Sequence, residues 1–380
     1  MRIAIVYDAV HPWVTGGGER RFHELAVRLA AAGHEVHWYG MRWWDGPSVI
    51  ERDGVVLHGV CRALPLYTPT GRRSVVQALV FGLACLRLLG ARYDVVDCCG
   101  FPYFSLFAAR LATWLRGGRL VSTWHEVWGP DYWRTYLGRL GIVGAVVERL
   151  AAQLPDTVVP VSPQTAGRLT ELGVRAPATV VVNGVDHTAV AAAEPAARGY
   201  DVVCAGRLCD FKDVELLLDA HALLLAERPG TTLGVVGDGP HREALQARVE
   251  ALGTGAHVEF TGWLPTESDV HGVLKSSGVL ALTSQREGFG IVVVEAHACG
   301  VPAVVADHPG NLATALVAPG TGTVCAPQPA AVAAALLAQL AILDDDDARA
   351  EVRAAARRNA DRYHWDTVAR EYADVLQGAK

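Results

Sequence analysis

The chain is 380 residues long and carries 34 lysines and arginines against 40 aspartates and glutamates, a formal net charge of −6. At about 100–200 residues per domain, this length predicts two domains, each able to bury a core. Hydrophobic residues make up 51% of the chain and charged residues 19%, which excludes a largely disordered protein. The acidic balance argues against a dedicated nucleic-acid-binding protein, so no nucleic-acid partner is expected.

No segment predicts export or a membrane span. The chain begins with the strand pattern Arg2–Val6 and lacks the long hydrophobic region of a signal peptide. The longest apolar run, Val75–Leu86, is shorter than the about 20 residues that cross a bilayer. The eight cysteines include no C-x-x-C pair, so reduced, mostly buried thiols in a cytoplasmic protein are expected. Residues 1–190 hold 19 arginines and 15 carboxylates, a weak basic excess that leaves a membrane surface open as a partner.

Short β-rich runs alternate with longer helical patterns, which is typical of parallel sheets built from βαβ units. The predicted strands of the first half are Arg2–Tyr7, Glu35–Tyr39, Val55–His58, Tyr93–Asp97, Arg119–Thr123, Thr157–Val161 and Thr179–Val182. Those of the second half are Asp201–Ala205, Thr232–Val236, His257–Phe260, Gly278–Leu282, Ala303–Ala306 and Thr323–Cys325. The first helix is predicted over Glu19–Ala32, where apolar residues recur at helical spacing.

We therefore expect an α/β protein with two doubly wound, Rossmann-like domains. The N-terminal domain covers 1–187 and the C-terminal domain 200–362, followed by a terminal segment over 363–380. Residues 188–199, rich in alanine and without apolar periodicity, are predicted to link the domains. Ligands of doubly wound sheets bind beyond the carboxyl ends of the strands, so a cleft between the domains is the expected active site.

A glycine-rich loop, Thr15–Arg20, lies between the first predicted strand and the first helix. Glycines let the backbone approach a ligand, and the start of a helix offers N–H groups to a phosphate. A dinucleotide fingerprint would need a further glycine where Arg21 stands, so that motif fails. The loop fits either phosphate binding or a flexible connection.

A second feature is the pair Arg207 and Lys212, in the turn that follows the first strand of the second half. Both could be ordinary surface charges. At a strand-to-helix turn, however, an arginine fork and a lysine point charge suit a diphosphate.

A third feature is a pair of carboxylates, Glu287 and Glu295, on either side of a Gly-Phe-Gly turn. The β-branched run Ile291–Val294 has strand propensity, but Gly300 is a typical helix end, and we predict a helix. The N–H groups of Phe289–Ile291 would then open that helix and face phosphate or sugar oxygens. Two unrelated surface carboxylates would not explain the turn between them.

In combination and in order, these motifs resemble those of family 4 glycosyltransferases, which are retaining, nucleotide-sugar-dependent enzymes of the GT-B fold. The motifs that carry the resemblance are Gly16–Arg20, Val182–Asp186, Gly206-Arg207 with Lys212, Gly237–Pro240, Phe260–Gly262, Glu287-x7-Glu295 and Tyr363–Trp365. The resemblance covers nearly the whole chain and is strongest over 201–310. It implies that the two domains face each other across a cleft, that the N-terminal domain binds the acceptor, and that the terminal helix returns to that domain.

The resemblance also implies roles for individual residues. The donor-binding residues would be Gly17, Gly18, Arg207, Lys212, Gly237, Gly262, Glu287, Phe289, Gly290, Ile291 and Glu295. Among them, Arg207 and Lys212 would neutralise the diphosphate, Glu295 would bind the ribose, and Glu287 would hold the donor sugar. His125, at a predicted strand end, matches the family's active-site histidine, although a lone histidine is often structural. The catalytic set implied in this way is His125, Glu287, Arg207 and Lys212.

Two further segments are relevant to contacts with the donor sugar and to metal binding. After the strand Ala303–Ala306 the family often has a carboxylate, but Gly310–Ala315 contains none. The acidic run Asp344–Asp347 precedes a helical pattern, where carboxylates complement the helix dipole. Because Arg207 and Lys212 would supply the positive charge, we expect neither a metal ion nor another cofactor.

The sequence therefore predicts a retaining glycosyltransferase that transfers a sugar from a nucleoside-diphosphate sugar to a hydroxyl of a small molecule, glycan or lipid. A UDP-sugar is favoured by its frequency in the family. The alternatives are another GT-B enzyme, such as an epimerase or a phosphorylase, and a non-catalytic nucleotide-sugar-binding scaffold. A dehydrogenase would need the missing glycine fingerprint. Trp124, Glu126 and Trp128 are predicted to contact the acceptor, whose identity stays open, as does the oligomeric state.

Overall fold

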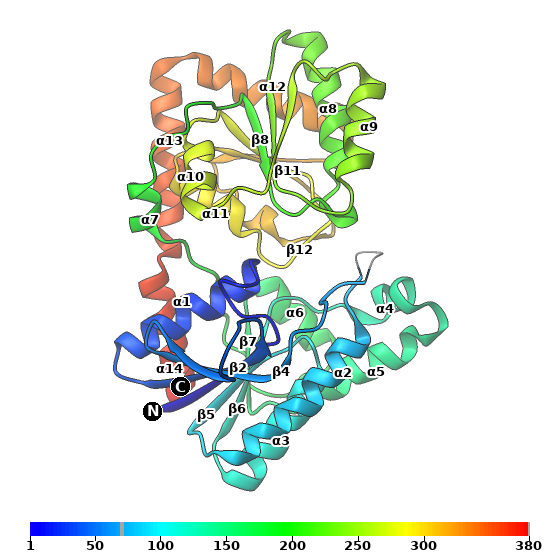
Figure 1. Cartoon of the computed structure of the whole chain (residues 1–380). Coiled ribbons are helices and arrows are strands. Elements are labelled where there is room, and N and C mark those ends of the chain that lie inside the picture. Colours follow the sequence, from blue (N-terminus) through cyan, green and yellow to red (C-terminus); the bar gives the residue numbers. More distant parts are fainter. Residues whose placement is uncertain (69–71, 379–380) are drawn as a thin grey trace. The chain divides into compact units, whose positions relative to one another are not determined.

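A computed structural model describes residues 1–68 and 72–378. The chain forms two compact units: residues 1–183 together with the C-terminal helix, and residues 184–364 (Figure 1). We call them unit 1 and unit 2. Each is an α/β unit with its own hydrophobic core around a mainly parallel sheet, which confirms the predicted fold class.

Unit 1 contains a seven-stranded sheet in which all strands are parallel except the edge strand β3. In spatial order the strands are β3 (Val49–Arg52), β4 (Val55–Arg62), β2 (Glu35–Arg42), β1 (Arg2–Val6), β5 (Val95–Cys99), β6 (Arg119–Trp124) and β7 (Thr157–Pro160). The helices are α1 (Gly17–Ala31), α2 (Val75–Ala84), η1 (Cys85–Gly90), α3 (Phe104–Arg116), α4 (Gly129–Leu137), η2 (Gly138–Leu140), α5 (Gly141–Ala151), α6 (Pro163–Glu171) and α14 (Trp365–Gln377). The strands β1, β5, β6 and β7 are buried on both faces, as expected of a doubly wound sheet.

Unit 2 contains a six-stranded parallel sheet and a two-stranded ribbon. In spatial order the sheet consists of β10 (Val258–Gly262), β9 (Leu233–Val236), β8 (Val202–Ala205), β11 (Val279–Leu282), β13 (Ala303–Ala306) and β15 (Gly322–Cys325), and the ribbon of β12 (Arg286–Glu287) and β14 (Gly310–Asn311). The helices are α7 (His187–Ala192), η3 (Asp210–Lys212), α8 (Val214–Glu227), α9 (Arg242–Leu252), α10 (Glu267–Lys275), α11 (Ile291–Ala298), η4 (Leu312–Leu316), α12 (Pro329–Asp344), α13 (Asp346–Ala360) and η5 (Asp361–Tyr363).

The segment expected to link the domains differs from the prediction in detail. The units divide between Asn183 and Gly184, and the predicted linker opens within helix α7, which Asp186 caps by accepting from the Ala189 N–H at 2.9 Å. The predicted strand Thr179–Val182 is not a regular strand. The N–H groups of Thr179 and Val181 donate to carbonyls of β7 at 3.1 Å, and the Val181 carbonyl accepts from the buried guanidinium of Arg21 at 2.8 Å.

Helix α14 packs against α1 within unit 1. Arg28 of α1 donates to Asp366 at 2.7 Å, and the Tyr372 hydroxyl donates to the buried carboxylate of Asp97 in the middle of β5. The last helix of the chain is thus bound to the first unit through both charged and buried polar contacts.

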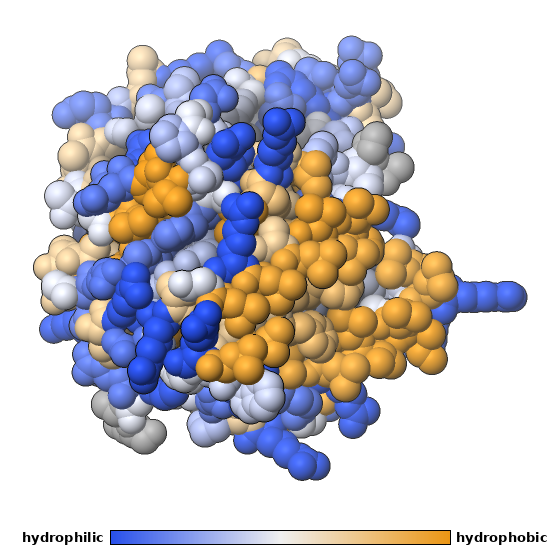
Figure 2. All heavy atoms as spheres, turned by 60° about the horizontal axis from the view of Figure 1, so that its bottom comes forward, coloured by the Kyte–Doolittle hydropathy of each residue, from blue (hydrophilic) through white to orange (hydrophobic). Residues whose placement is uncertain are grey.

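The surface of unit 1 has an unusual composition. Large apolar side chains of α2, α3 and α5 are exposed on one face, which Figure 2 shows in orange. Within residues 1–68 and 72–378, no helix has both the length and the apolar character needed to cross a bilayer.

Candidate active site

In unit 2 the candidate site lies where the strand order reverses. Strand β8 comes first in the chain and pairs with β9 on one side and β11 on the other. The loops after β8 and β11 therefore run in opposite directions and leave a crevice at the carboxyl edge of the sheet, the usual ligand position in such folds. A small cavity of about 20 Å³ lies there, lined by Arg207 and Lys212 from one loop and Ser284 from the other.

Glycines hold the loops at this edge in contact. Gly206 after β8 has φ +150° and Gly237 after β9 has φ +128°, and a Cβ on Gly237 would lie 1.9 Å from the Gly206 carbonyl oxygen. The Gly237 N–H donates to the carbonyl of Gly262, at the end of β10, at 2.9 Å. Gly237 and Gly262, both predicted from sequence, thus fix the backbone beside Arg207.

Lys212 and Glu287 are in direct contact. The Lys212 ammonium, at the end of η3, lies 2.5 Å from Oε1 of Glu287 in β12, and the Ser284 hydroxyl donates to the same oxygen at 2.8 Å. The two side chains are 21% and 12% exposed, so both reach solvent from a largely enclosed position. The cation predicted for the diphosphate and the carboxylate predicted for the sugar are therefore neighbours at one site.

The predicted helix after Glu287 is confirmed as α11. Gly290 occupies its N-cap position in the left-handed region, with φ +87°, and a Cβ there would lie 2.4 Å from the Cβ of Ala313. Phe289 is buried and packs its ring against Tyr363 with centroids 5.8 Å apart. The turn thus connects Glu287, at the end of β12, to the start of α11 at Ile291.

Glu295 lies one turn into α11 and is 7% exposed. Its Oε1 atom is 3.7 Å from Nε2 of His271 in α10. The two carboxylates of the motif thus lie on different elements, Glu287 in β12 and Glu295 in α11. The ribose contact predicted for Glu295 stays a prediction.

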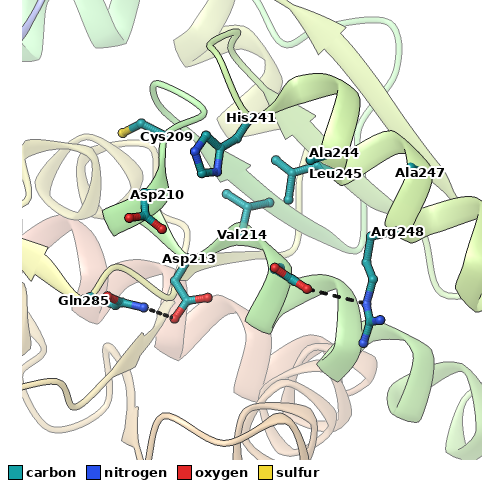
Figure 3. Close-up of a pocket in the computed structure, with 11 residues that line it drawn as sticks. Cys209, Asp210, Asp213, Val214, His241, Ala244, Leu245, Ala247, Arg248 and Gln285 are labelled. Atoms are coloured by element: carbon teal, nitrogen blue, oxygen red, sulfur yellow. Dashed lines mark hydrogen bonds and ion pairs between the residues drawn. The ribbon is translucent and has the colours of Figure 1, made fainter. Parts of the chain in front are cut away.

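A larger groove of about 460 Å³ lies between the η3–α8 segment and α9 (Figure 3). The charged residues that line it are Asp210, Asp213, Glu215 and Arg248. Arg248 forms an ion pair with Asp219 at 2.8 Å. Because carboxylates dominate this lining, the groove does not suit a diphosphate. The diphosphate site predicted from the sequence therefore corresponds to the small cavity lined by Arg207 and Lys212, not to this larger groove.

In unit 1 the glycine loop packs against His125. A Cβ on Gly18 would lie 3.1 Å from the Tyr7 hydroxyl and 3.4 Å from Nε2 of His125, whereas a Cβ on Gly17 would meet open space. Burial lowers the pKa of His125 to about 3, with a smaller contribution from Arg21, so the imidazole is neutral near pH 7. Its Nε2 atom is buried and has no hydrogen-bond partner within the described part of the chain.

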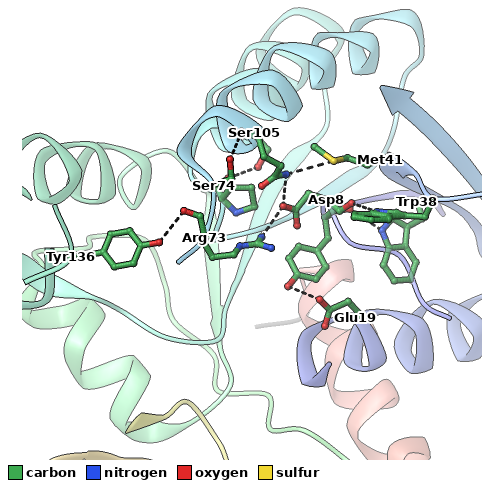
Figure 4. A network of polar contacts seen from close by, with 12 residues as sticks. Asp8, Glu19, Trp38, Met41, Arg73, Ser74, Ser105 and Tyr136 are labelled. Atoms are coloured by element: carbon green, nitrogen blue, oxygen red, sulfur yellow. Dashed lines mark hydrogen bonds and ion pairs between the residues drawn. The ribbon is translucent and has the colours of Figure 1, made fainter. Parts of the chain in front are cut away.

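A polar network at the end of β1 escaped the sequence analysis (Figure 4). The buried carboxylate of Asp8 accepts from Arg73 at 2.8 Å and from Gln77 at 2.7 Å, while its second oxygen has no partner among the described residues. Nearby, Tyr7 contacts Glu19 at 3.5 Å, and burial raises the pKa of both groups. A carboxylate directly after a predicted strand was the signal that could have revealed it.

The structure corrects the predicted acceptor contacts. Trp124 is 1% exposed and packs in the core against Gly100 and Tyr103, so its ring has no face for an acceptor. Trp128 is partly exposed, stacks on Phe101 at 5.0 Å and donates its indole N–H to Glu126 at 2.7 Å. Of the three predicted residues, Glu126 and Trp128 therefore form a pair that a ligand could reach.

The loop that carries Trp128 is held by a buried carboxylate that the sequence analysis missed. Glu148 of α5 is fully buried and accepts from the N–H groups of Trp128 and Gly129, the Tyr103 hydroxyl and the Trp133 indole, at 2.8–3.0 Å. Burial raises its pKa, and the four donors oppose that shift.

Comparisons with known proteins agree with this architecture. Residues 15–189 match the family model described as Glycosyltransferase Family 4, and residues 190–359 match the model described as Glycosyl transferases group 1. The chain is 30% identical to a glycogen synthase of Mycobacterium tuberculosis over 100% of this chain and 95% of that protein. It is 31% identical to a D-inositol 3-phosphate glycosyltransferase of Jonesia denitrificans over 93% of this chain and 89% of the relative.

Two solved structures share the fold at low sequence identity. Sucrose-phosphate synthase from Thermosynechococcus elongatus gives a TM-score of 0.80 at 20% identity and covers 100% of this chain and 98% of its own. HepE of Anabaena, in complex with UDP and glucose, gives a TM-score of 0.75 at 21% identity, with 100% of both chains covered.

Proposed function

Because this chain belongs to family 4 of the glycosyltransferases and has their GT-B fold, we propose that it transfers a sugar from a UDP-sugar to an acceptor hydroxyl with retention of anomeric configuration. The observation that carries the proposal is the group of side chains at the β8–β11 crevice. Arg207 and Lys212 line one cavity, and the start of α11 follows in the adjoining loop. Two cations and a helix N-terminus form a favourable site for a diphosphate.

The proposed reaction needs no protein nucleophile. The oxygen of the departing diphosphate would take the proton of the acceptor hydroxyl on the same face of the donor sugar. Arg207 and Lys212 would stabilise the negative charge that grows on the diphosphate as the glycosidic bond breaks. Glu287, which contacts Lys212, would position both that cation and the sugar hydroxyls.

The family resemblance assigns His125 to the reacting sugar, and its state in unit 1 supports the assignment. A neutral imidazole with a buried, unpartnered Nε2 atom can donate or accept one hydrogen bond without a change of charge. A hydroxyl of the sugar is a suitable partner for such a group.

The nucleobase of the donor needs a direct test. HepE was solved with UDP and with UDP-glucose, whereas a relative from Mycolicibacterium smegmatis is named for its dependence on GDP-mannose. The relatives' names also mention different acceptors, among them inositol 3-phosphate and a phosphatidylinositol monomannoside. We favour UDP for the donor and a hydroxyl of a sugar or cyclitol for the acceptor.

A two-stage experiment tests the proposal. Thermal unfolding is followed with UDP- and GDP-sugars, since a ligand at 100 times its Kd should stabilise the protein by about 2.7 kcal/mol. The stabilising donor is then incubated with candidate acceptors, and the product is analysed by NMR. We expect UDP release that depends on the acceptor and an anomeric configuration equal to that of the donor.

The alternatives give different results in the same assay. An epimerase would convert the donor sugar without an acceptor, and a phosphorylase would release a sugar phosphate from a glycoside and inorganic phosphate. A scaffold would bind the donor without turnover. An inverted product would contradict the retaining mechanism.

A further inference from the structure

One face of unit 1 exposes apolar side chains to an unusual degree. Of the 21 large apolar residues that are exposed in the described chain, 15 lie on the five helices α2, η1, α3, η2 and α5. We call their exposed surface the apolar face. The most exposed members are Val76, Leu83, Trp114, Leu140, Ile142 and Val143, at 56–75% exposure. Because α3 packs against both α2 and α5, these side chains form one surface (Figure 2).

Helical spacing shows that this exposure is systematic. In α2, Val76, Val80 and Leu83 follow one another at the i, i+4, i+7 positions of a single stripe, while Ala78 and Phe81 on the opposite side are buried. A surface helix normally has one apolar stripe directed at the core and a polar outer face. Here the outer face is apolar too, which marks an interaction surface.

The exposed charges on the same elements are all positive. Arg87, Arg116, Arg139 and Arg149 are exposed, and Arg110 pairs with Asp156 outside these helices. The one carboxylate within the five elements is Glu148, which is fully buried and holds the Trp128 loop. At helical spacing Arg149 follows Val146 by three residues and Arg87 follows Leu83 by four, so the arginines adjoin the apolar stripes.

We propose that the apolar face docks on an anionic lipid bilayer, with its leucine, valine and tryptophan side chains in the interfacial region and its arginines at the lipid phosphates. This combination of apolar, tryptophan and basic side chains is typical of helices that lie in the membrane interface. A second copy of the chain suits the face less well. A two-fold contact would bring arginines together with no exposed carboxylate of the face to pair with them.

Sedimentation with lipid vesicles tests the proposal on the whole protein. Vesicles of phosphatidylcholine alone are compared with vesicles that also contain about 30 mol% phosphatidylglycerol, an anionic lipid. We expect the protein to sediment with the anionic vesicles and to be released in part by high salt, which screens the arginines. A protein that stays in the supernatant with the anionic vesicles contradicts the proposal.

Matched variants locate the contact. Leu83→Glu with Ile142→Glu should lower the partition coefficient at least tenfold, and Arg87→Gln or Arg149→Gln about fivefold each. Leu223→Glu on α8 and Arg358→Gln on α13 alter exposed residues of unit 2 and should have no effect. Unchanged binding of the double glutamate variant overturns the assignment. So does a wild-type dimer, seen by analytical ultracentrifugation, that this variant dissociates, because the face would then belong to a second copy.

Discussion

The imidazole of His125 packs beside Gly18 and Tyr7, and its neutral state follows from burial. A residue that contacts the reacting sugar, but not the nucleotide, should contribute to catalysis rather than to binding. Glu295 represents the opposite case, since its proposed partner is the ribose. The roles of the two side chains, in catalysis and in donor binding, can therefore be distinguished by experiment.

We expect His125→Ala to lower the single-turnover rate strongly while nucleotide affinity stays within about 0.5 kcal/mol of the wild type. Glu295→Gln should lower donor affinity, because an amide replaces one of two hydroxyl-accepting oxygens with a donor. Calorimetry and rapid-quench kinetics on both variants check this. Wild-type turnover in His125→Ala would show that the histidine is structural.

The pKa of His125 also predicts a pH dependence of stability. Because the folded-state pKa of about 3 lies below the ordinary 6.5, the unfolded chain binds a proton between these values that the folded chain does not. This residue therefore destabilises the fold as pH falls through 6.5. Between pH 7.5 and 5.5, wild type should lose about 1.4 kcal/mol relative to His125→Gln in urea unfolding. Parallel pH profiles of the two proteins would contradict the burial of the imidazole.

At the scale of elements, the loops after β8, β9 and β10 support one another, because Gly237 contacts the backbone of both Gly206 and Gly262. Gly237→Ala should destabilise unit 2 by more than about 2 kcal/mol, since a Cβ would lie 1.9 Å from the Gly206 carbonyl oxygen, and it should weaken UDP binding. Gly253→Ala is the matched control. Gly253 ends α9 at φ +69°, and a Cβ there would meet open space. The substitution should therefore cost only about 1 kcal/mol of stability and leave UDP affinity unchanged. Equal losses in both variants would show that the close contact is unimportant.

Most strands and the helix α11 were predictable because hydrophobic runs and glycine positions report on local structure. The edge strand β3 was missed because it is mostly exposed and carries no apolar alternation. A signal was nevertheless present, since Asp53 and Gly54, both at positive φ, form the Asp-Gly turn of a β3–β4 hairpin. Strands β12 and β14 have two residues each, too short for any pattern to show.

The site was predictable where its residues are close in sequence. Lys212 and Glu287 were identified as members of motifs, but their contact at 2.5 Å depends on how η3 and β12 pack and could not be read from spacing. Asp8 and Glu148 belong to no motif, and their partners are up to 69 residues away in the chain. Trp124 was misassigned because its position in the sequence does not reveal that its ring points into the core.

At the scale of the whole molecule, the proposal makes positive side chains, not a metal ion, responsible for the leaving diphosphate. Turnover should therefore persist in an excess of chelator, at a rate within about twofold of the untreated enzyme. Donor consumption measured with and without chelator checks this. Activity that disappears in chelator and returns with Mn²⁺ or Mg²⁺ would overturn the role given to Arg207 and Lys212.

The most direct test of the account is a calorimetric titration of UDP and of uridine into wild type, Lys212→Ala and Lys275→Ala. Lys275 is the matched control, because its ammonium donates to the carbonyl groups of Ala191 and Ala193 in the same unit. We predict that Lys212→Ala weakens UDP binding by about 1.5–3 kcal/mol, the value of a hydrogen bond to a charged group, and leaves uridine binding unchanged. Lys275→Ala should bind both ligands as the wild type does. Equal UDP affinity in Lys212→Ala and wild type would contradict the diphosphate site at the β8–β11 crevice.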